Sequence, residues 1–202
     1  ITYTASVNNP VTGSPLVLTL SNGQTITIPV GQSSGTSDPL AVRGDDAYAQ
    51  GDQTVAVGIT GTSGGNYESL DTSSTATTTV SDDTDATTVA LTASSASVTE
   101  GGSITYTASV DQAVTGAPLV VVLSNGQTIT IPVGQSSGTS DPVAVRADNQ
   151  YAQGDQTVTV SITGASGGNY ESLDTSATAI TTVSHDADVT PGTLAASAGS
   201  GG

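Results

Sequence analysis

The sequence predicts an all-β protein made of two antiparallel β-sandwiches in tandem. Residues 1–86 align without a gap on residues 104–189, and 68 of these 86 positions are identical. Apolar and polar residues alternate with a period of two, and turn residues recur every ten or so positions. The spacing of 103 residues is too long for a solenoid repeat and close to the size of one immunoglobulin-like (Ig-like) sandwich.

Each element of the second repeat follows from this alternation. Val158, Val160 and Ile162 alternate with polar residues, for example, as a half-buried strand requires. Asn125-Gly126 stands between two apolar runs and predicts a hairpin with a type I′ turn. We expect seven strands, at residues 88–94, 103–110, 119–124, 127–133, 139–147, 156–163 and 176–184.

Domain boundaries follow from the repeat. We expect a first Ig-like domain at 1–84, a second at 85–187, and at 188–202 a flexible tail or the start of a further repeat. Because Ile1 aligns with Ile104, the first domain lacks a counterpart of the first strand of the second.

Composition limits the functions that the chain can serve. Without Phe, Trp, Met or Cys, each core must consist of Val, Ile, Leu, Ala and a few Tyr, and disulfides cannot staple it. The net charge of −16 comes from 18 acids against only Arg43 and Arg146. This charge excludes binding to nucleic acid and to anionic membrane surfaces, and it favours binding of cations.

The acids fall in loops, while the strands carry neutral Thr and Ser. Alternating strand directions sort these loops onto two ends of each sandwich. The end after the last strand gathers Asp45, Asp46, Asp52, Asp82, Asp83 and Asp85 in the first repeat, and Glu100, Asp148, Asn149, Asp155, Asp186 and Asp188 in the second. The opposite end of the second repeat carries Asp111, Asp141, Glu171 and Asp174, of which all but Asp141 are candidate ligands.

These acids are our candidate calcium ligands. Like charges this close repel one another unless a divalent ion lies between them, and calcium takes six to eight oxygen ligands. We expect at least one ion at the linker 82–85 between the repeats, where three carboxylates fall within four residues. The alternative interpretation is a solvated acidic surface adapted to salt.

Two further patterns give no candidate catalytic or ligand-binding residue. Gly31-Gln32-Ser33-Ser34-Gly35 matches the nucleophile elbow of hydrolases, but the first repeat has no His to serve as its base, so we expect no enzymatic activity. Tyr48, Tyr67, Tyr151 and Tyr170 stand singly in loops, and we interpret them as local packing anchors.

The run Ser97-Val-Thr-Glu-Gly-Gly-Ser-Ile-Thr-Tyr-Thr107 resembles the opening of the bacterial Ig-like extender repeats of giant RTX adhesins. Together with the Asn-Gly hairpin, the Tyr-Ala-Gln-Gly-Asp loop and the Asp-Asp-Thr-Asp linker, the likeness is closest to the repeat region of the Marinomonas ice-binding adhesin. The likeness covers the chain to about residue 188. His185 departs from it, since it replaces the counterpart of Asp82, and the nonapeptide RTX calcium repeat is absent.

This resemblance implies a calcium-stiffened spacer of a large adhesin on the bacterial cell surface, exported by type I secretion, which holds a distal ligand-binding domain away from the cell. Calcium is the only cofactor that we expect. The expected partners are neighbouring repeats of the same chain, with no membrane insertion and no small-molecule substrate, and we expect a monomer. The alternative is a module that binds a surface glycan through calcium. The absence of Trp and Phe for stacking on sugar rings argues against it.

Overall fold

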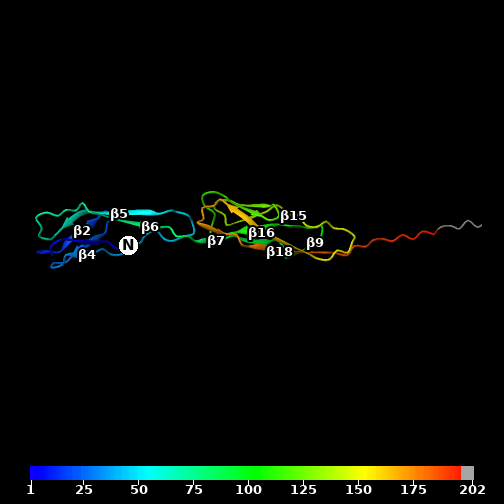
Figure 1. Cartoon of the computed structure of the whole chain (residues 1–202), viewed down its shortest axis with the longest axis horizontal. Coiled ribbons are helices and arrows are strands. Elements are labelled where there is room, and N and C mark those ends of the chain that lie inside the picture. Colours follow the sequence, from blue (N-terminus) through cyan, green and yellow to red (C-terminus); the bar gives the residue numbers. More distant parts are fainter. Residues whose placement is uncertain (197–202) are drawn as a thin grey trace, which may run out of the picture. The chain divides into compact units, whose positions relative to one another are not determined.

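A computed structural model describes residues 1–196 of the chain, and none of these residues lies in a helix. The chain divides into two compact units (Figure 1). The first consists of Ile1–Asp46 and Gln50–Asp83, and the second of Ala47–Ala49 and the chain from Thr84 onward. The predicted all-β class with antiparallel sandwich sheets is confirmed.

The first unit contains a four-stranded sheet and a two-stranded sheet. Their strand orders are β3-β2-β5-β6 and β1-β4, and all pairs are antiparallel. Its core consists of apolar side chains from alternate strand positions, such as Leu16, Ile26 and Ile28. The strands are β1 (Thr4–Ser6), β2 (Leu16–Leu20), β3 (Thr25–Ile28), β4 (Ser34–Thr36), β5 (Gln53–Ser63) and β6 (Thr75–Val80).

The second unit repeats this plan with more strands. Its main sheets have the orders β13-β12-β16-β18-β9 and β14-β11-β8, and two small sheets pair β10 with β15 and β17 with β7. The strands are β7 (Ala86–Thr88), β8 (Ala90–Ala93), β9 (Ser97–Thr99), β10 (Ser103–Ile104), β11 (Tyr106–Ser109), β12 (Leu119–Leu123), β13 (Thr128–Ile131), β14 (Ser137–Thr139), β15 (Val143–Ala144), β16 (Gln156–Ser166), β17 (Ser172–Asp174) and β18 (Thr178–Ser184).

Both Asn-Gly hairpins form, but not with the expected turn. A type I′ turn needs positive φ at both central residues, and in the described chain only glycines have positive φ. Gly23 has a φ of 85°, and its amide donates to the carbonyl of Leu20 at 3.0 Å. The geometry is a type I turn followed by a left-handed glycine, and the Asn22 side chain accepts a bond from the Gln24 amide.

Three predicted strands of the second repeat are broken. The strand expected at 103–110 is divided between β10, which pairs with β15, and β11, which pairs with β14 and β8. The strand expected at 139–147 is reduced to β14 and β15, because Pro142 between them has no N–H for a ladder bond. The strand expected at 88–94 is divided between β7, which pairs in parallel with β17, and β8, which pairs with β11. Residues 188–196 lie outside any strand, and the rest of the predicted tail lies outside the described residues.

The sheets of the two units differ at the equivalent strands β1 and β11. In the second unit β11 lies between β14 and β8, and Val89 and Leu91 beside it are buried. In the first unit β1 pairs with β4 alone. Beside β1 runs a hollow lined by core side chains that include Tyr3, Ala5, Leu18, Val57 and Leu70.

Candidate metal-binding site

Three exposed carboxylates converge at one end of the second unit. Asp148 follows β15, and Asp186 and Asp188 follow β18. One carboxylate oxygen of each lies within 4.8 Å of the other two. The Asp188 charge is the main cause that raises the pKa of Asp148 above its ordinary value, with burial and the charges of Asp186 and Glu100 adding to it. Such a set of hard oxygen donors suits calcium, which would turn the repulsion into attraction.

A second group of possible ligand atoms joins Asp186 to Glu100 and His185. The Glu100 side chain is fully buried; its Oε2 accepts a bond from Arg146 Nε at 2.9 Å, and its Oε1 contacts His185 Nδ1. Burial acts to raise the pKa of Glu100, but the hydrogen bond with His185 and the charge and hydrogen bond of Arg146 outweigh it, so the pKa is lowered. Both Glu100 oxygens are therefore engaged by protein groups.

The other two predicted ligands at this end, Asp155 and Asn149, accept hydrogen bonds from backbone amides. Asp155 Oδ1 accepts a bond from the His185 amide at 3.2 Å, and Asn149 Oδ1 accepts one from the Tyr151 amide at 3.0 Å. These bonds fix the loop before β16 and the segment after β18 beside the three converging carboxylates.

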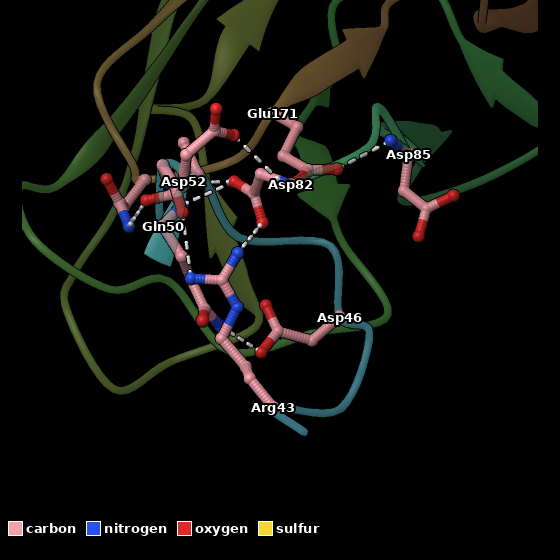
Figure 2. Close-up of polar contacts among 10 residues, drawn as sticks. Arg43, Asp46, Gln50, Asp52, Asp82, Asp85 and Glu171 are labelled. Carbon is pink, nitrogen blue, oxygen red and sulfur yellow. Dashed lines mark hydrogen bonds and ion pairs between the residues drawn. The ribbon is translucent and has the colours of Figure 1, made fainter. Parts of the chain in front are cut away.

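In the first unit the predicted ligands gather around Arg43 (Figure 2). Arg43 Nη2 lies 2.9 Å from Asp82 Oδ1, while Asp82 Oδ2 accepts bonds from the amides of Gln50 and Gly51 at 2.7 and 3.0 Å. The Gln50 side-chain amide donates to Asp46. Asp52 Oδ1 accepts a bond from the Asp82 amide at 3.3 Å.

Our sequence reasoning did not assign the two arginines to this chemistry. Arg43 and Arg146 are the only cations apart from a histidine and the N-terminus, and they occupy equivalent repeat positions beside acidic loops. Their position next to acidic loops in both repeats could have predicted ion pairs with these acids. Asp45, in the same loop, and Asp83, after Asp82, are exposed.

Glu171, directly before β17 in the second unit, carries a buried carboxylate oxygen in need of a partner. Glu171 Oε2 accepts a bond from the Asp85 amide at 2.6 Å (Figure 2). Within the described part of the chain, Glu171 Oε1 is buried without a hydrogen-bond partner. Since a buried carboxylate oxygen is costly when unpaired, a cation or water is the expected complement here.

The other two predicted ligands in this region have different roles. The backbone and side chain of Ser176 donate to Asp174, and these bonds, the backbone one first, lower the Asp174 pKa. Asp111 contributes to raising the pKa of Tyr170, after burial and Tyr48. Among residues 1–196 we find no helix that is long and apolar enough to cross a membrane.

Comparison with protein families assigns both repeats to one domain type. The LapA domain family matches residues 1–84 and again residues 85–187. No curated protein matches the chain. The two matches cover most of the sequence and agree with the all-β fold of the two units. The chain therefore belongs to the LapA domain family, as two tandem domains of a bacterial adhesin-type region of the cell surface.

Proposed function

We propose that this chain is a calcium-stiffened spacer of a large secreted adhesin of the RTX type. The repeats would hold a distal ligand-binding domain away from the cell, after type I secretion. The observation that carries the proposal is the convergence of Asp148, Asp186 and Asp188 at one end of a repeated domain. Near-identical copies favour a spacer, since an array that provides length needs copies and a specific binding site does not.

Electrostatics supports calcium as the stiffening ligand. Two arginines face 18 acids, so internal ion pairs neutralise only a small part of the charge. Extracellular calcium modules bind with dissociation constants of roughly 10⁻⁴–10⁻³ M. Sites of that affinity are filled outside the cell and empty in the cytosol. The linker acids Asp82, Asp83 and Asp85, with Glu171, belong to the same proposal.

The nucleophile-elbow sequence gives no support to catalysis. An elbow needs a strand followed by a helix, with a base next to the serine. Here Ser33, the serine of the motif, is followed directly by strand β4, which pairs with β1, and no residue of 1–196 is helical. These features favour a structural role.

Melting with calcium and with chelator tests the proposal. At 10 mM calcium, a site with the dissociation constant above stabilises the folded second unit by about 1.4–2.7 kcal/mol. The double variant D186N/D188N should lose this gain. Asp141→Asn, between β14 and β15, removes an acid outside this group and is the control, which should keep the gain. An unfolding midpoint indifferent to EDTA in the unaltered chain would overturn the calcium assignment.

Small-angle scattering tests stiffening separately from binding. With calcium, the two-repeat chain should show a narrower distribution of dimensions than with chelator. If calcium raises the melting temperature but leaves the scattering profile unchanged, the protein binds calcium without being stiffened by it.

A further inference from the structure

Two tyrosines distant in the sequence are held side by side within the second unit. The segment Ala47–Ala49 belongs to that unit, and its central residue, Tyr48, forms an antiparallel bridge with Tyr170. The Ala49 amide donates to Asn169 O at 3.0 Å. The Glu171 amide donates to Ala47 O at 3.2 Å. The backbone thus holds the segment as a short extra strand along residues 169–171.

The two phenol rings of this pair lie against each other. They stack with centroids 5.6 Å apart and an interplanar angle of 26°. The Tyr48 hydroxyl donates to Ala113 O, and the Tyr170 hydroxyl donates to the neighbouring carbonyl, Gln112 O, each at 2.6 Å. Burial is the main cause that raises the pKa of Tyr170, and Tyr48 is the next. Two phenol oxygens on consecutive carbonyls bring the ring carbons ortho to them close together.

The other four tyrosines have no ring beside them. Among residues 1–196, Tyr48 and Tyr170 are the one pair of aromatic rings in contact. Tyr3 and Tyr106 are buried singly in the two cores. The Tyr151 side chain is 77% exposed, which contradicts our interpretation of it as a packing anchor. Coupling between two tyrosines of one molecule is therefore confined to a single pair.

We propose that Tyr48 and Tyr170 form an oxidative cross-linking site, which a peroxidase with hydrogen peroxide converts to dityrosine. Each phenol gives up one electron and one proton and becomes a phenoxyl radical. The two radicals couple through one ring carbon ortho to each oxygen, and the hydrogens of these two carbons return to the phenol oxygens as protons. The pair thus loses two hydrogen atoms in all, which reduce one hydrogen peroxide to two molecules of water.

The structure favours this coupling over reaction with other partners. A radical on one ring meets the second ring without diffusion, because the backbone bridge already holds the two together. Both side chains are half-buried, so the oxidant reaches them and the stacked rings can turn edge to edge to form the bond.

The cross-link has a mechanical consequence for the chain. A covalent bond between residues 48 and 170 removes the intervening segment from the path along which a pulling force acts. About 120 residues are bypassed, and they correspond to about 420 Å of extended chain. This reinforcement goes beyond the proposed calcium-stiffened spacer and does not require calcium.

Peroxidase treatment of the dilute chain tests the site. In calcium-free buffer, which separates this test from the calcium proposal, the monomer should gain dityrosine fluorescence. Mass spectrometry of its peptides should find Tyr48 joined to Tyr170 with the loss of two hydrogens. Tyr48→Phe keeps a ring in place but removes the phenol, so this variant should lose the cross-link. Tyr67→Phe removes an unstacked tyrosine and is the matched control, which should keep it.

Tyr151→Phe distinguishes coupling within a molecule from coupling between molecules. It removes the exposed tyrosine, so it should lose cross-linked dimers and keep the link within the monomer. Dityrosine in the monomer that persists unchanged in Y48F, or that joins other tyrosines, would overturn the proposal.

Single-molecule stretching from the two termini provides a second readout. After peroxidase treatment, the unaltered chain should reach a full extension shorter by about 420 Å than before treatment. The Y48F variant should reach the same full extension before and after treatment. An unaltered chain that extends as far as Y48F after treatment would also overturn the proposal.

Discussion

The two repeats share 68 of 86 aligned residues, yet their sheets end differently. In the second unit β8 covers β11, whereas in the first unit β1 has an open edge beside a hollow lined by core residues. The covering strand β8 lies in residues 89–103, which directly precede Ile104, the equivalent of Ile1. The equivalent strands β1 and β11 therefore differ in their neighbours.

The two equivalent arginines also bind different carboxylates. Arg43 and Arg146 each donate through Nη1 to a glycine carbonyl, of Gly51 and Gly154, at 2.8 and 2.9 Å. Arg146 then pairs with Glu100, which lies on the segment, while Arg43 pairs with Asp82. The position of Asp82 is His185 in the second unit, and His185 also contacts Glu100. The backbone thus fixes the arginine, and the available acid completes the pair.

Adding a copy of this covering strand should stabilise the first unit. A copy of residues 89–103 placed directly before Ile1 provides the residues that are Val89 and Leu91 in the second unit, where they are buried. Each such side chain contributes about 1.5–3 kcal/mol, opposed by the entropy of ordering the strand. We expect the free energy of unfolding of the first unit to rise by on the order of 2 kcal/mol in urea titrations.

The matched control is the same extension with alanine in place of its Leu91 equivalent. Because a buried Leu→Ala change costs about 2–5 kcal/mol, this version should lose most or all of the gain. Stability unaffected by either extension would mean that the open edge of β1 does not receive this strand.

Removing each arginine should separate the two ion pairs. Arg146→Met leaves the fully buried Glu100 without its cation, whereas Arg43→Met leaves Asp82, whose side chain is 22% exposed. Uncompensated buried charge costs more than partly solvated charge, so the loss of stability in R146M should be about twice that in R43M or more. Urea unfolding at pH 7 measures both.

Acid should reduce the R146M effect. The pKa of Glu100 is lowered from 4.5 in the folded protein, so its contribution is present above that value and is lost as the pH falls through the lower folded pKa. The difference between R146M and the unaltered chain should therefore shrink on acidification to about pH 3. A difference that stays constant from pH 7 to pH 3 would show that Arg146 acts through packing and not through the Glu100 charge.

The strands were predictable where local pattern determines them, and their partners were not. Asn22-Gly23 predicts a hairpin and makes one, because a glycine with positive φ is a local requirement. The turn spans Leu20 to Gly23, so its central residues are Ser21 and Asn22 and not Asn22 and Gly23. The Asn-Gly dipeptide alone does not reveal this. The parallel pairings of β7 with β17 and β9 with β18 join segments about 86 residues apart, beyond the reach of alternation.

The acidic end of the second unit was predictable from loop polarity, which sorts Asp148, Asp186 and Asp188 together, as the structure does. The ion pairs of Glu100 with Arg146 and His185 were not predictable, because net charge does not determine which of many acids pairs with one of few basic residues. The tyrosines show the same limit. Tyr48 and Tyr151 stand in the same local sequence, but one is stacked on Tyr170 and the other is 77% exposed.

These two tyrosines provide the smallest and cleanest comparison of the repeats. Tyr48→Ala removes a ring stack worth about 0.5–1.5 kcal/mol and a hydrogen bond worth about 0.5–1.5 kcal/mol, so the second unit should lose about 1–3 kcal/mol. The exposed Tyr151→Ala should change stability by no more than about 0.5 kcal/mol. Hydrogen exchange gives a local readout, because the Glu171 amide donates to Ala47 O. Its protection should fall in Y48A and remain in Y151A. Protection of Glu171 that survives Y48A would show that the backbone bridge, and not the ring, holds residues 47–49 against residues 169–171.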